Sequence, residues 1–202
     1  MGREILNQMP PAANHVVPYG PDPNQFGELR LPDSGAKPFP VAVLIHGGYW
    51  RAAYDLKQMG HIGGDLRAYG VASWNIEYRR LGQAGGAWPA MGNDVRAAVF
   101  HLKALERKHA LDLGRVIPIG FSAGGQLALW CAAEAPLPLL GAISLAGVAD
   151  LRRAWELKLS GNVMSELMGG SREGYGGARG DFAALCGGSR LRTDGIRRGR
   201  PL

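Results

Sequence analysis

The chain has 202 residues, of which 46% are hydrophobic and 20% are charged, and it carries a net charge of +6. This length is enough for one globular domain with a sizeable core. No stretch approaches the roughly 18 continuous apolar residues of a membrane span, and the first residues lack the apolar core of a signal peptide. We therefore expect a cytoplasmic protein that has no membrane partner.

The positive charge is unevenly distributed along the chain. Residues 171–202 contain seven arginines and three acidic residues, a net charge of +4, which leaves only +2 for residues 1–170. A nearly neutral body argues against nucleic acid as a partner. Cys131 and Cys186 are far apart in the sequence, and the five histidines show no ligand spacing, so we expect neither a metal site nor a cofactor.

Hydrophobic patterning predicts strands that alternate with helices. Continuous apolar runs of the kind found in buried parallel strands occupy residues 41–46, 71–76, 115–119 and 140–146. Helical spacing or composition predicts helices over residues 55–69, 90–109 and 126–134. This alternation predicts an α/β fold, a mostly parallel sheet with helices on both faces. Asp94, near the start of one helix, suits the helix dipole, and we interpret it as structural.

Ser122 lies in the run Gly-Phe-Ser-Ala-Gly-Gly between a predicted strand and a predicted helix. The pattern Gly-x-Ser-x-Gly places a serine on a sharp strand-to-helix turn, where Gly120 and Gly124 allow close backbone approach. The pattern predicts Ser122 as a nucleophile and the Ala123 amide as an oxyanion donor. The alternative is an ordinary serine in a glycine-rich turn.

A second glycine-containing loop follows the predicted strand 41–46. It reads His46, Gly47, Gly48, Tyr49, Trp50. We assign a second oxyanion donor to Gly48 and Tyr49, and we expect Gly47 to shape the turn. His46 fits a residue that supports the loop by hydrogen bonding better than it fits a catalytic base. Tyr49 and Trp50 either line a substrate pocket or pack against the sheet.

Together, the two motifs resemble those of the α/β-hydrolase superfamily, and more narrowly its small esterases and kynurenine formamidase-like enzymes. Residues 75–81 and 88–94, and a possible first hairpin over 19–32, fit the same branch, and the resemblance covers roughly residues 15–170. It implies a serine hydrolase that cleaves a small carboxylic ester or an aryl formamide through an acyl-enzyme intermediate. It also implies that residues 150–168 cap part of the active site.

The resemblance implies two further strands, which would carry the acid and the histidine of a catalytic triad. No histidine follows Ser122, and residues 171–202 hold eight glycines and seven arginines without a strand-like run. We hypothesise an incomplete hydrolase domain over 1–170, with its C-terminal strands missing, and a tail over 171–202 that is disordered or out of frame. A natural arginine-rich tail that binds RNA is the rival interpretation. The protein is then an impaired hydrolase or a catalytically dead pseudoenzyme, in an oligomeric state that the sequence does not determine.

Overall fold

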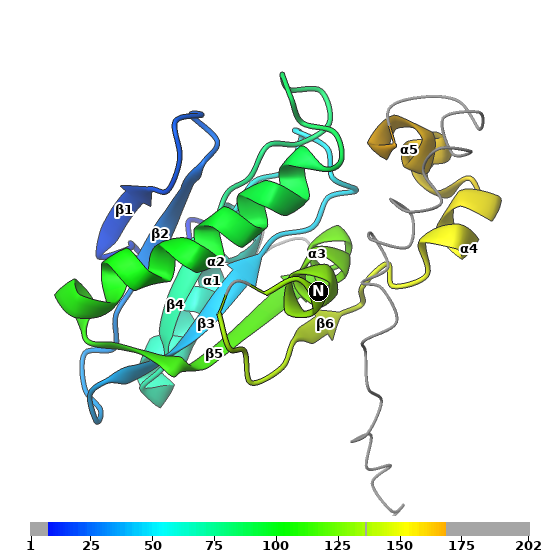
Figure 1. Ribbon diagram of the computed structural model, residues 1–202. Helices are drawn as coiled ribbons and strands as arrows, with labels where there is room; N and C mark the ends of the chain where they lie inside the picture. Colours follow the sequence, from blue (N-terminus) through cyan, green and yellow to red (C-terminus); the bar gives the residue numbers. More distant parts are fainter. Residues whose placement is uncertain (1–7, 136, 169–202) are drawn as a thin grey trace, which may run out of the picture.

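A computed structural model describes residues 8–135 and 137–168 and shows a single six-stranded sheet with helices on both faces (Figure 1). The strands are β1 (His15–Pro18), β2 (Phe26–Arg30), β3 (Phe39–Ile45), β4 (Ala72–Ile76), β5 (Leu111–Phe121) and β6 (Ile143–Leu145). The helices are α1 (Lys57–Leu66), the 3-10 turn η2 (Arg67–Tyr69), α2 (Ala90–His109), α3 (Ala123–Ala133), α4 (Leu151–Glu156) and α5 (Leu159–Leu167).

The strand order is β1-β2-β4-β3-β5-β6. Strands β4, β3, β5 and β6 are mutually parallel, whereas β1 and β2 form an antiparallel hairpin on one side. The expected mostly parallel sheet is therefore confirmed. Because β3 and β5 are neighbours, with Ile45 opposite Gly120, the loops that follow these two strands leave the sheet side by side.

Side chains along β3 point alternately to the two faces of the sheet, so the core has two layers, one on each face. Val41, Val43 and Ile45 belong to the larger layer, which also contains the buried faces of α2 and α3. Ala42 and Leu44 point to the other face of the sheet, where they pack with Met59 of α1. Successive side chains of a strand point to opposite faces, so one apolar strand supports helices on both sides.

The predicted elements differ from the observed ones mainly at their ends. The strand expected at 115–119 runs from Leu111 to Phe121, because Phe39 at the start of β3 pairs with Leu111. The strand expected at 140–146 is reduced to three residues, which pair with β5 alone. The helix expected from residue 126 begins at Ala123. Residues 169–202 lie outside the described residues, so our interpretation of the tail and of its boundary stays an expectation.

Strand β6 forms an edge of the sheet. Within the described part of the chain, no strand pairs with its outer side. The Ile143 and Leu145 side chains are 42% and 38% exposed, and Phe121 on the neighbouring strand is 37% exposed. An apolar edge of this kind is prone to pairing with other chains.

Cys131 is buried in the interior face of α3. Its surroundings are apolar, and burial raises the pKa of its thiol to about 12. Thiolate is the reactive form of cysteine, so the folded protein holds Cys131 in an unreactive state at neutral pH.

We expect native protein carrying Cys186→Ser to react very slowly with a thiol reagent at pH 8, and to react fully in urea. Because the unfolded thiol ionises near pH ~8.5, the unfolding free energy should also fall as the pH rises from there toward the folded pKa. Timed labelling followed by mass spectrometry measures the first effect, and urea titrations at pH 8 and pH 10 measure the second. Rapid stoichiometric labelling of the native protein would contradict this account.

Candidate active site

Ser122 occupies a strained turn between β5 and α3. Its φ and ψ are 52° and −116°, a region that non-glycine residues rarely adopt. Three backbone hydrogen bonds hold the turn: Ser122 N donates to Leu145 O at 2.9 Å, and Ser122 O accepts from Gly125 N at 2.9 Å and from Val148 N at 3.2 Å. Ser122 is half-buried, and its hydroxyl makes no hydrogen bond to any described residue. The backbone of Ser122 is therefore held in place, while its hydroxyl is unpaired among the described residues.

Glycines allow the Ser122 turn to touch the loop that follows β3. A Cβ atom on Gly124 would lie 2.2 Å from Ile45 O and 2.4 Å from His46 O, and one on Gly120 would lie 1.9 Å from Gly124 O. A Cβ on Gly47 would lie 3.0 Å from the Ser122 Cβ. Only hydrogen fits at these positions, so the sequence-predicted residues of the two loops come together in space.

The backbone of the second loop is turned so that its amides are left available. Gly48, Tyr49 and Trp50 all have positive φ, at 101°, 52° and 57°. Among the described residues, none accepts a hydrogen bond from Gly48 N or Tyr49 N. The Ala123 amide is also unpaired by helix geometry, because it belongs to the first turn of α3. Unpaired amides beside a serine hydroxyl are the elements of an oxyanion site.

The bulky residues of this loop point into the protein. The His46 ring is fully buried, with Nε2 2.9 Å from Glu77 Oε1 and Nδ1 2.8 Å from Gly47 O. Both ring nitrogens are therefore engaged away from Ser122, which fits a supporting residue and not a base. Trp50 is also fully buried and donates to Gln126 Oε1, so it packs in the core and does not line a pocket. Tyr49 is half-buried against the same core.

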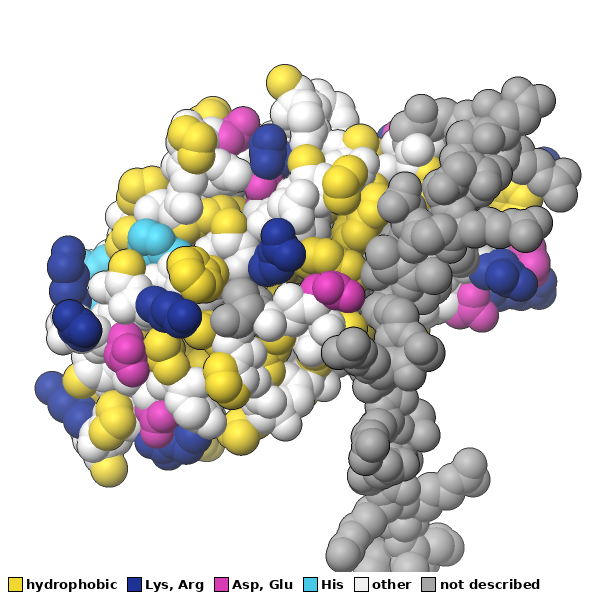
Figure 2. All heavy atoms as spheres, viewed as in Figure 1, with side chains coloured by type: hydrophobic (Ala, Val, Ile, Leu, Met, Phe, Trp, Pro, Cys, Tyr) yellow, Lys and Arg dark blue, Asp and Glu magenta, His cyan; other side chains and the backbone are white. Residues whose placement is uncertain are grey.

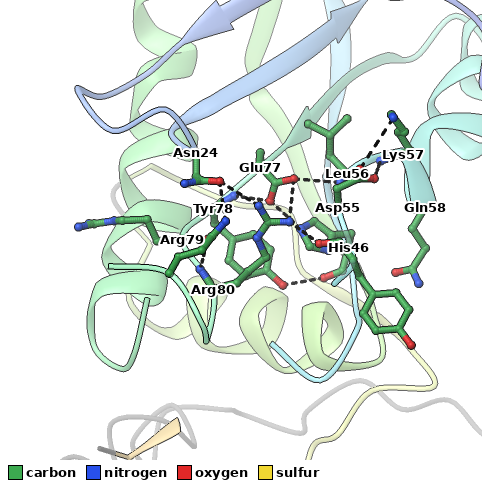
Figure 3. A network of polar contacts seen from close by, with 12 residues as sticks. Asn24, His46, Asp55, Leu56, Lys57, Gln58, Glu77, Tyr78, Arg79 and Arg80 are labelled. Atoms are coloured by element: carbon green, nitrogen blue, oxygen red, sulfur yellow. Dashed lines mark hydrogen bonds and ion pairs between the residues drawn. The ribbon is translucent and has the colours of Figure 1, made fainter. Parts of the chain in front are cut away.

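The sequence analysis missed Glu77, which lies at the centre of the polar network below the loop (Figure 3). Its carboxylate accepts hydrogen bonds from His46 Nε2 and Tyr78 N on Oε1, and from Leu56 N on Oε2. Arg80 Nη1 lies 3.2 Å from Oε2. Arg80 also reaches the Tyr54 carbonyl and the Asn24 side chain. The signal in the sequence for a role of Glu77 is its charge, directly after an apolar strand.

Asp94 is structural, as expected, but our reason was wrong. It is 1% exposed, and no acidic residue lies in the first turn of α2, so the helix dipole does not explain it. Instead its carboxylate binds the Arg79 guanidinium at 2.6 and 2.8 Å, and it accepts from Gln25 Nε2 at 2.6 Å. These contacts raise the pKa of Arg79. Asp94 thereby ties α2 to the segment after β4.

Helices α4 and α5 cover the loops at this end of the sheet. Arg51 Nη2 pairs with Glu166 Oε1 at 2.8 Å, and Trp88 N donates to Leu167 O at 3.1 Å. A cavity of about 330 Å³ lies beside Trp88, lined by residues between 81 and 90; Ser122 is not among its lining residues. Residues 150–168, which we expect to cap the active site, are thus largely helical and contact Arg51 and Trp88; their role as a cap stays a prediction.

No imidazole is placed to serve Ser122 in the described ranges. His15 and His109 face each other with ring centroids 4.6 Å apart, His101 stacks on Trp74, and His61 contacts Gln8 O. The histidine side chains visible in Figure 2 lie over β1 and α2, away from α4 and α5. The structure supplies a serine and candidate amide donors, without a partner that could take the serine proton.

Residues 8–135 and 137–168 contain no group of three or more His, Cys, Asp or Glu side chains placed to hold a metal ion. In the same ranges, no helix has both the length and the apolar character needed to cross a bilayer.

Comparison with known proteins places this geometry among esterases. The sequence model of the BD-FAE family matches residues 28–138. Esterase LipC of Mycobacterium tuberculosis is 32% identical over 112 residues, which are 55% of this chain and 27% of that protein. The chain therefore spans about a quarter of the length of this curated relative.

Two solved structures have the same fold. A bacterial heroin esterase superposes with a TM-score of 0.53 at 28% identity, over 62% of this chain and 40% of its own. Esterase B from Lactobacillus rhamnosis superposes with a TM-score of 0.70 at 21% identity, over 82% and 59% of the two chains. The second likeness shows the fold alone. The expected α/β-hydrolase fold is confirmed.

We expect Gly124→Ala to destabilise the protein by more than about 1–3 kcal/mol, because the new methyl group would meet two backbone carbonyls that cannot move independently. Gly141→Ala is the matched control, since nothing lies within 4 Å of a Cβ at that position. Urea denaturation followed by tryptophan fluorescence measures both. Equal midpoints for the two variants would refute the close approach.

Asp94→Asn should lower the unfolding free energy by about 3–5 kcal/mol, because it leaves the Arg79 guanidinium without its buried anion. Glu156→Gln makes the same chemical change in an exposed pair with Arg153 and should have little effect. Thermal and urea unfolding of both variants provide the comparison. A stability loss for Glu156→Gln as large as that for Asp94→Asn would contradict the assigned burial.

Proposed function

Because the chain belongs to the BD-FAE family, within the α/β-hydrolase superfamily, we propose that it is a serine hydrolase in which Ser122 is the nucleophile. The observation that carries the proposal is the contact between the Ser122 turn and the loop bearing Gly48 and Tyr49. A reacting hydroxyl and unpaired amides on two adjacent loops are what acyl transfer requires.

The proposed reaction has two halves. The Ser122 oxygen attacks the substrate carbonyl carbon, and the negative charge that develops on the carbonyl oxygen is stabilised by the amides of Ala123 and of Gly48 or Tyr49. The bond to the alcohol or amine then breaks, and the leaving group takes up a proton, which leaves an acyl-serine. Water attacks this ester, releases the carboxylic acid and returns the proton to the serine oxygen.

The substrate that we propose is a small carboxylic ester or an aryl formamide. The similar proteins support an ester as the general class, since they are esterases. A half-buried serine suits a small acyl group. The resemblance of residues 46–50 and 75–81 to formamidase-like enzymes supports an aryl formamide as the second substrate.

Proton transfer is the weak step in this scheme. Ser122 has no imidazole beside it among the described residues, so its proton passes to solvent. Enzymes deprived of one triad member keep roughly 10³–10⁴-fold acceleration over water, owing to the oxyanion site and binding. We therefore propose an impaired enzyme. The same observation favours the second candidate, a pseudoenzyme that retains the fold for binding.

A fluorophosphonate probe separates the two candidates. We expect slow labelling of the folded chain, complete loss of labelling in Ser122→Ala, and unchanged labelling in Ser34→Ala, whose serine lies on an exposed connector. Hydrolysis of p-nitrophenyl acetate should follow the same order. Labelling that survives Ser122→Ala would exclude this nucleophile, whereas a folded wild-type protein that never labels would favour the pseudoenzyme.

A further inference from the structure

We propose that Glu77 is a positioning residue, which sets the direction of the Gly48 amide through the His46 ring. The inference rests on the proposed function, because it explains how one of the oxyanion donors is held. It concerns a residue that touches neither Ser122 nor a substrate. Two contacts run from the Glu77 carboxylate through the His46 ring to a single peptide group of the loop.

The key contact is made by His46 Nδ1, which lies 2.8 Å from Gly47 O. Gly47 O and Gly48 N belong to the same peptide group, and this group is planar and trans. The carbonyl and the N–H of such a group point in opposite directions. A hydrogen bond that turns Gly47 O inward, toward the buried ring, therefore turns Gly48 N–H outward, on the side left open to a substrate oxygen.

The hydrogen-bond partners determine where the ring carries its protons. A carbonyl oxygen can only accept, so Nδ1 must hold a hydrogen to bind Gly47 O. Nε2 faces Glu77 Oε1 at 2.9 Å. The carboxylate already accepts from two backbone amides and lies beside the Arg80 guanidinium, which suits its ionised, acceptor-only form. Because that form of the carboxylate also only accepts, Nε2 must carry a hydrogen too, and the ring donates from both nitrogens, to Glu77 Oε1 and to Gly47 O.

The ring itself has little freedom to turn. It is fully buried and stacks on Tyr78, with centroids 4.6 Å apart and planes inclined by 22°. The Tyr78 hydroxyl donates to His46 O at 3.0 Å, and burial raises the pKa of this phenol, so it stays protonated. On the other side of the loop, Gly47 N donates to Gln58 Oε1 at 2.7 Å. His46 O and Gly47 N belong to one peptide group, so these two bonds fix the peptide that directly precedes Gly47–Gly48.

Glu77 is a suitable anchor because it joins three segments. Its partners lie in the loop after β3, at the start of α1 and in the segment after β4, and they converge on one carboxylate that is 2% exposed (Figure 3). The Glu77 carbonyl also accepts from Tyr19 OH at 2.6 Å, which adds the β1–β2 hairpin. Because these contacts fix the Glu77 side chain on several sides, its carboxylate also fixes the position of the His46 ring.

Glu77→Gln tests the proposal, because the amide offers one acceptor oxygen in place of two. Per folded molecule, we expect fluorophosphonate labelling of Ser122 to slow at least tenfold, short of the roughly 10²–10³-fold loss seen when one oxyanion donor is removed. In ¹⁵N–¹H spectra of glycine-labelled protein, the Gly48 amide signal should shift. Glu77→Gln protein that labels at the wild-type rate and keeps its Gly48 signal would overturn the proposal.

Asp94→Asn is the matched control. It also removes the charge from a buried carboxylate with a full set of partners, but no contact links Asp94 to the Gly47–Gly48 peptide. We expect a similar loss of stability with a labelling rate per folded molecule within about twofold of wild type. An equal slowing in both variants would mean that Glu77 acts only through stability.

Ring ¹⁵N spectra of the wild-type protein give a second test that does not depend on a variant folding or on activity. We expect the Nδ1 signal of His46 to be that of a protonated nitrogen. An unprotonated Nδ1 would overturn the proposal directly. The two proposals can also fail separately. Suppose that the wild-type serine does not label, but that His46 Nδ1 is protonated and the Gly48 amide signal shifts in Glu77→Gln. The proposed function then fails, and the positioning role of Glu77 stands.

Discussion

The close approach of two backbone segments, the end of β3 and the first turn of α3, determines the geometry of this protein. Gly120, Gly124 and Gly47 lie where a single methyl group would collide with a carbonyl or with the Ser122 side chain. Because these neighbours are backbone atoms of a packed sheet, they cannot give way as a flexible side chain would. The absence of three Cβ atoms is what lets the serine lie against the second loop.

Buried polar groups lie below this close approach and support the loop and the segment after β4. Two buried carboxylates, Glu77 and Asp94, meet complete sets of donors under this end of the sheet. A buried charge is tolerated only when it is paired and hydrogen-bonded. The network therefore fixes where the loop can lie, and it leaves little freedom for alternative packings of the segment after β4.

Ser122 is also coupled to the weakest part of the sheet. Its strained backbone is held by Leu145 of β6 and by Val148 just beyond it, and β6 is a three-residue edge strand with exposed apolar side chains. Any partner that paired with this edge would stiffen the strand that holds the nucleophile.

The sequence alone determined the order of the elements, the parallel sheet, and the two glycine motifs, because apolar periodicity and glycine placement are local properties. It predicted site roles for Ser122, Gly48, Tyr49 and Ala123, which stay predictions, and it favoured the supporting interpretation of His46. It left open whether Trp50 lines a pocket. It explained Asp94 by the helix dipole and not by an ion pair, and it assigned no role to Glu77. Those three roles depend on partners far along the chain, from His46 to Glu77, Gln25 to Asp94 and Trp50 to Gln126. Only the tertiary structure brings such residues together, because strand order, and not sequence spacing, decides which loops become neighbours.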